Sequence, residues 1–112
     1  MSIDIQKSGI DIGIVTTNIE AMMKFYQTDL GLELEGAVPM PGGGTMNRFK
    51  VGDTIVKVID MDPAPAATAA PGGIRGATGY RYWTITVGNL AEVVQKIGDA
   101  GHKVIVAGQE IR

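Results

Sequence analysis

The chain has 112 residues but no cysteine, and its only histidine is His102. Without cysteine it can form no disulfide, hold no zinc ion through thiolates and use no thiol nucleophile. A single histidine also leaves little room for a Ser-His-Asp arrangement, and no such spacing is present. These absences exclude the commonest nucleophilic and thiolate chemistries.

Strong charge and long apolar runs are also missing. The net charge is −2 and no cluster of lysine and arginine is present, which argues against a nucleic-acid partner. No apolar run is long enough to cross a bilayer, and the N-terminus does not have the pattern of a signal peptide. The composition, 45% hydrophobic and 20% charged, is typical of a globular protein. We therefore expect a cytoplasmic protein that binds neither membranes nor nucleic acids.

An internal repeat is the most informative feature that is present. Residues 11–19, DIGIVTTNI, are echoed by residues 82–90, YWTITVGNL. Each copy runs from an alternating, strand-like segment through an asparagine into a segment of helical periodicity, and ends at Gly31 or Gly101. A repeat of this kind indicates one structural unit used twice.

The first copy continues further than the second. Its alternating strand around Ile12 and its helix after Asn18 are followed by three predicted strands, at 32–38, 45–51 and 54–61. The second copy offers a strand over 82–87, a helix from Leu90 and one more strand over 102–106. Its closing hairpin is missing, so we expect either further residues beyond Arg112 or completion by a second copy of the chain.

The predicted fold class is α+β, with two βαβββ-type modules forming one half-open curved sheet with the helices outside. The first module covers residues 1–62 and the second, which lacks its last strands, covers residues 80–112. Residues 63–79, rich in alanine, proline and glycine, are interpreted as a linker.

The repeat, together with Phe25-Tyr26 and Asp29-Leu30-Gly31-Leu32, resembles the vicinal oxygen chelate superfamily. This superfamily includes glyoxalase I, extradiol dioxygenases, methylmalonyl-CoA epimerases and the bleomycin- and fosfomycin-resistance proteins. The resemblance implies a ligand cavity inside a half-open barrel. It also implies a homodimer, because family members often build their barrels between chains.

The resemblance places the family's metal ligands at positions that hold other residues here. Asp11 stands where His or Gln is usual, Lys57 where Glu is usual and Tyr82 where a second His is usual. The fourth ligand, a Glu on the final strand, has no counterpart. An ammonium group repels a cation and one carboxylate holds it weakly, so we expect no metal site and no other cofactor, with Asp11 the only plausible metal ligand.

Four residues are predicted to contact a ligand: Asp11, Lys57, Tyr82 and Thr84. Side-chain parity places them opposite the apolar residues that pack on the helices. Asp11 is open to three interpretations: a ligand contact or general base, a salt-bridge partner of Lys57, or a solvated residue at the strand start. Lys57 either pairs with Asp11 or an anionic ligand, or covers apolar surface with its stem.

The remaining polar candidates have plainer interpretations. His102 is interpreted as a turn or surface residue, and Arg48 and Lys50 as a solvated strand face. No catalytic residue can be assigned, and whether the protein is an enzyme stays open. The first functional hypothesis is a small-molecule-binding protein that uses no metal. The alternative is a divalent-metal-dependent lyase, epimerase or dioxygenase that uses Asp11 and a carboxylate beyond residue 112.

Overall fold

The computed structural model describes residues 2–105 of the chain. Four strands form one mixed, open sheet in the order β1-β4-β3-β2, in which β1 and β4 are parallel and the other neighbours antiparallel. The strands are β1 (Asp11–Thr16), β2 (Glu33–Pro39), β3 (Gly44–Val51) and β4 (Thr54–Met61). The predicted α+β class, with strands at these positions, is confirmed.

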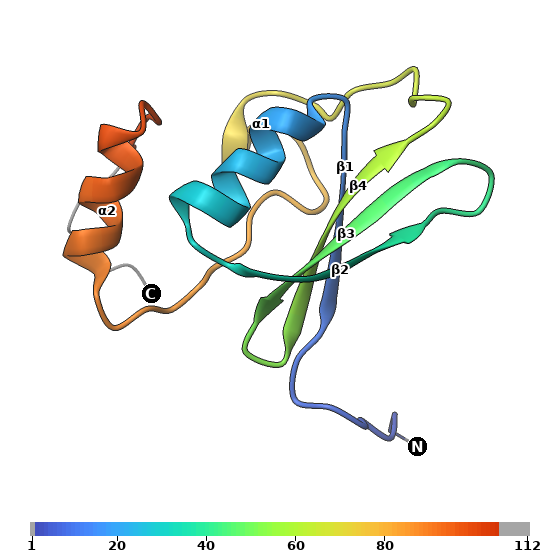
Figure 1. Cartoon of the computed structure of the whole chain (residues 1–112), viewed down its shortest axis with the longest axis horizontal. Helices are drawn as coiled ribbons and strands as arrows, with labels where there is room; N and C mark the ends of the chain where they lie inside the picture. The colour runs from blue at the N-terminus through green and yellow to red at the C-terminus, as the bar shows by residue number, and fades with distance from the viewer. Residues whose placement is uncertain (1, 106–112) are drawn as a thin grey trace.

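Helices lie on one side of the sheet (Figure 1). The helix α1 (Ile19–Met23) continues directly into the π-helical segment η1 (Lys24–Asp29), and Gly31 ends this layer in a left-handed conformation with a φ of 71°. The second helix, α2 (Leu90–Asp99), lies on the far side of α1 from the strands, and a short 3-10 turn, η2 (Gly73–Arg75), precedes it. No helix in residues 2–105 is long and apolar enough to cross a membrane.

The core lies between this helical layer and the sheet. Phe49, Val56 and Val58 are fully buried and pack against Tyr26 of η1. Alternation in β3 and β4 sends these side chains to the helical side, as the sequence pattern predicts. Truncating Phe49 to alanine would cost roughly 3–5 kcal/mol of stability, because the surrounding structure cannot close such a cavity.

The predicted strands of the second copy are not formed. Residues 80–87 and 102–104 have no ladder hydrogen bonds, and within residues 2–105 every strand lies before Asp62. Residue 106, the end of the second predicted strand, lies outside the described residues. The alternation of segment 82–87 persists in its burial, with Trp83 and Ile85 half-buried. An alternating pattern sets which side chains are buried, but a strand also needs a neighbouring strand to pair with.

The predicted linker is tied to Arg81, two residues beyond its end. Arg81 donates hydrogen bonds from Nε to the carbonyl oxygen of Gly73, and from Nη2 to those of Ala70 and Pro71. Three carbonyl acceptors on one guanidinium hold this loop against the start of the second copy.

Candidate functional site

The side of the sheet away from α1 carries two of the predicted ligand contacts, Asp11 and Lys57, and we call it the open face. In β1, Ile14 packs into the core, so the alternate residues Asp11, Gly13 and Val15 lie on the open face. Cross-strand pairing then assigns the remaining positions to this face. They are Ile55, Lys57, Ile59 and Met61 of β4, Met46, Arg48 and Lys50 of β3, and Glu33, Glu35 and Val38 of β2.

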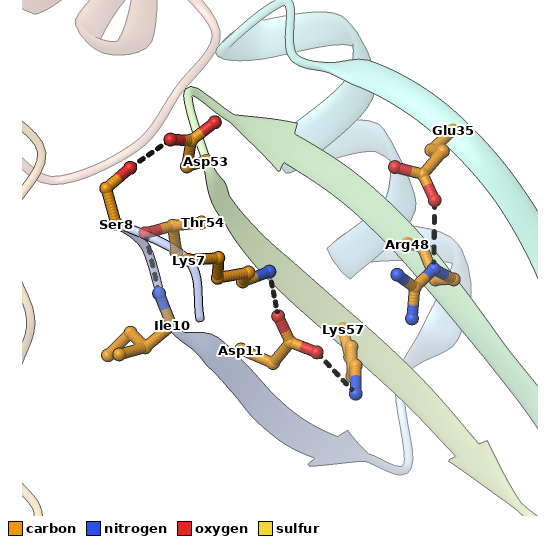
Figure 2. Close-up of polar contacts among 9 residues, drawn as sticks. All are labelled: Lys7, Ser8, Ile10, Asp11, Glu35, Arg48, Asp53, Thr54 and Lys57. Carbon is orange, nitrogen blue, oxygen red and sulfur yellow. Dashed lines mark hydrogen bonds and ion pairs between the residues drawn. The ribbon is translucent and has the colours of Figure 1, made fainter. Parts of the chain in front are cut away.

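Asp11 lies between two ammonium groups. Its Oδ1 is 2.8 Å from Nζ of Lys7 and its Oδ2 is 3.0 Å from Nζ of Lys57, as Figure 2 shows. Hydrogen bonds from Lys7 and then Lys57 hold the pKa of Asp11 at about 2, below its ordinary value of 3.8. Of the interpretations open for Asp11, the salt bridge with Lys57 is formed, and the carboxylate is ionised at neutral pH.

The charged set extends across the sheet. Arg48 pairs with Lys57 in the register of β3 and β4, and its Nε donates to Oε1 of Glu35 at 3.2 Å. Nζ of Lys50 lies 3.7 Å from Oε2 of Glu33. Arg48, interpreted as part of a solvated face, lies on the open face with its side chain 27% exposed and beside Lys57. The alternation of side chains within the predicted strand 45–51 was the sequence signal that could have placed Arg48 beside Lys57.

Tyr82 and Thr84 do not join this set within the described chain. Both are exposed, Tyr82 to 65%, and neither has a hydrogen bond to Asp11 or Lys57. Their neighbour Trp83 stacks on Tyr26, with ring centroids 6.3 Å apart, and draws the segment to the helical layer. The structure therefore brings two of the four predicted ligand contacts together.

The described donors do not suit the family's metal ion. The carboxylate of Asp11 already accepts from two ammonium groups, and the resemblance puts Lys57, a cation, where the family has a carboxylate ligand. A divalent cation at Asp11 would lie within a few ångströms of two positive charges. No group of three potential metal ligands occurs in residues 2–105.

A second carboxylate, not predicted as functional, holds the helical layer together. Asp29 is 5% exposed, accepts from Nζ of Lys24 at 2.8 Å and lies 2.6 Å from Nε2 of His102. Hydrogen bonds from Lys24 and then His102 lower the pKa of Asp29. The ring of His102 also packs edge-on to Phe25. His102 is thus a link between the segment after α2 and η1 rather than a free surface residue.

Three hollows lie near these groups. A cleft of about 780 Å³ opens at the end of β1, between Val15, Met40, Met61 and the loop 65–69. A smaller hollow of about 300 Å³ lies on the helical side, where Trp83 and Ile85 meet η1. The first reaches the open face through Val15 and Met61. A third hollow, of about 230 Å³, lies against Asp11 itself and is lined by Ile10, Asp11, Ile12, Gly13 and Tyr80.

Comparison with known proteins gives a consistent result. The family model described as Glyoxalase/Bleomycin resistance protein/Dioxygenase superfamily matches residues 10–109. A search of curated proteins finds no significant match.

Solved structures share the fold at low identity. SMU.1112c is 19% identical with a TM-score of 0.65, over 86% of this chain and 76% of that one. YycE of Bacillus subtilis, a protein of unknown function described as a candidate glyoxalase/fosfomycin resistance protein, is 19% identical with a TM-score of 0.65, over 92% and 74%. A glyoxalase family protein from Enterococcus faecalis is 22% identical with a TM-score of 0.57, over 88% and 72%.

Proposed function

The chain belongs to the glyoxalase/bleomycin resistance protein/dioxygenase superfamily, and we propose that it binds a small molecule on the open face of its sheet without a metal ion. The observation that carries this proposal is the ion pair of Asp11 and Lys57, displayed on that face with a hollow of about 230 Å³ at Asp11 and the large cleft at the far end of the same strands. The side chain of Lys57 is 22% exposed and that of Asp11 37%, so both remain accessible to a ligand. Partly exposed, convergent polar groups beside an apolar cleft are typical of ligand sites.

A homodimer is the proposed assembly. An open sheet face becomes an enclosed cavity only when another element covers it, and a second chain is the simplest cover. Tyr82 and Thr84, exposed on one side of segment 82–87, are proposed ligand contacts in that assembly. Light scattering would distinguish a dimer from the 11.8 kDa monomer.

The alternative is a divalent-metal-dependent lyase, epimerase or dioxygenase. It is supported by family membership and by the accessible carboxylate of Asp11 at a ligand position. It requires that a metal ion displace both lysines from Asp11.

Calorimetric titration of chelator-stripped protein with Mn²⁺, Fe²⁺, Ni²⁺ and Zn²⁺ separates the two functions. We expect no stoichiometric binding of any of the four ions, because Asp11 keeps its two ammonium partners. Binding of one ion per chain that disappears in Asp11→Asn would favour the metalloenzyme instead.

A further inference from the structure

Side chains on the open face form rows that run across the strands. Gly13, Lys57 and Arg48 are paired in register, and we call them the cationic row. Two residues further along each strand, an apolar row follows. It consists of Val15, Ile59, Met46 and Val38. The apolar row in turn borders the cleft at Met61.

The cationic row places two like charges side by side. Residues paired across antiparallel strands have Cβ atoms about 4.5–5.5 Å apart, and like charges at such positions are destabilising. Lys57 is drawn to Asp11 on one side and Arg48 to Glu35 on the other, so the two cations are held by partners at opposite edges. Within residues 2–105, Lys7, Lys57 and Arg48 pair only with Asp11 and Glu35, which leaves an excess of one positive charge.

The guanidinium of Arg48 has hydrogen-bond donors that are not used by Glu35. Its Nε is engaged by Glu35, and within residues 2–105 its two terminal nitrogens have no hydrogen-bond acceptor. Figure 2 shows these nitrogens on the side of Arg48 that faces Lys57. A planar fork beside an ammonium group suits a carboxylate or another small oxyanion.

The apolar row continues this site. Val15 is 51% exposed and Val38 42%, so the two ends of the apolar row are uncovered, whereas Ile59 between them is only 8% exposed. Gly13 has no side chain to obstruct the space beside Lys57, and the nearest atom to a Cβ there would be Ile59 Cδ1 at 3.6 Å. A strand rise of about 3.3 Å per residue places Met61 roughly 13 Å beyond Lys57.

We infer that the ligand is an amphipathic anion, an inference that rests on the proposed small-molecule function. Its carboxylate, or a similar oxyanion, lies between Lys57 and Arg48, and its apolar body lies on the apolar row and extends toward the cleft at Met61. The anion relieves the repulsion within the cationic row, and the body covers the exposed valines. Arg48 is therefore a specificity-determining residue of the site.

Calorimetry with three eight-carbon probes tests this inference: octanoate, 1-octanol and octylammonium. Octanoate should bind at least tenfold more tightly than either other probe. Arg48→Gln and Lys57→Gln should each weaken octanoate binding roughly tenfold, because each removes a charged donor. Lys50→Gln is the matched control. It removes one charge from the same face but outside the cationic row, and it should change the affinity less than twofold.

The outcomes separate this inference from the function on which it rests. If 1-octanol binds as tightly as octanoate and the Gln variants bind both equally well, the open face binds ligands but the anionic assignment is wrong. Failure of all three probes to bind saturably would overturn both. Circular dichroism confirms that each variant is folded, and Arg48→Lys, which keeps the charge, provides a second test of the fork.

Discussion

Two carboxylates in this protein each contact two basic side chains, yet they lie in contrasting surroundings. Asp11 stands on the open face, 37% exposed, between Lys7 and Lys57. Asp29 stands in the helical layer, 5% exposed, between Lys24 and His102. A carboxylate in water gains little from an ion pair, whereas a buried one depends on its partners. The comparison assigns Asp29 to stability and leaves Asp11 available for a ligand.

Removing each carboxylate should give the largest contrast. Asp29→Ala should lower the Tm by roughly 5–10 °C at neutral pH, because His102 loses its hydrogen bond to the Asp29 carboxylate and the link to the segment after α2 is broken. Lys24, which is exposed, regains water and limits the loss. Asp11→Ala is the matched control, and its Tm should fall by less than about 3 °C. Equal losses in thermal unfolding would contradict the division of roles.

A double-mutant cycle of Asp29 and His102 should give smaller changes in Tm and show whether the two residues act through their mutual contact. His102→Ala alone should lower the Tm by about half as much as Asp29→Ala, since Lys24 still holds the carboxylate. Added to Asp29→Ala, it should cause little further loss, because the two residues act through one contact. Additive losses would show that His102 stabilises chiefly through its edge-on packing against Phe25.

The fold could be predicted to the extent that it depends on local patterns. The strands around Ile12 and Val56 and the helix end at Gly31 follow from alternation, periodicity and a glycine at positive φ. Segment 82–87 has an equally clear alternation but no strand partner in residues 2–105, and pairing is not encoded in the segment itself.

The candidate site could likewise be predicted only where local sequence patterns determine it. Asp11 and Lys57 could be placed together from strand parity, and Arg48 could have been added by applying parity to β3. The contact between Asp29 and His102 joins residues 73 positions apart, on segments whose relative position no local pattern specifies. Tyr82 was placed by analogy with the first copy, and Trp83, which stacks on Tyr26, holds its segment elsewhere.

The smallest expected effect is on the titration of Asp11. Its pKa of about 2 should rise toward 3.8 in Lys7→Gln and Lys57→Gln, more in the first, because the hydrogen bond from Lys7 contributes most. Because the pKa of Asp11 is depressed in the folded state, its contacts with the two lysines stabilise that state above pH 3.8. This contribution is lost as the pH falls toward 2. Carboxyl-carbon chemical shifts, followed by NMR, report the midpoint. An unchanged midpoint in both variants would show that neither lysine holds the carboxylate in solution.

Backbone amide NMR of the protein titrated with octanoate tests most directly which side of the sheet serves binding. We predict the largest shifts at Gly13, Met46 and Lys57 on the open face, and none at Asp29 or His102. Shifts centred instead on Leu30, Trp83 and Ile85, which line the hollow on the helical side, would contradict the assignment of the open face as the ligand site.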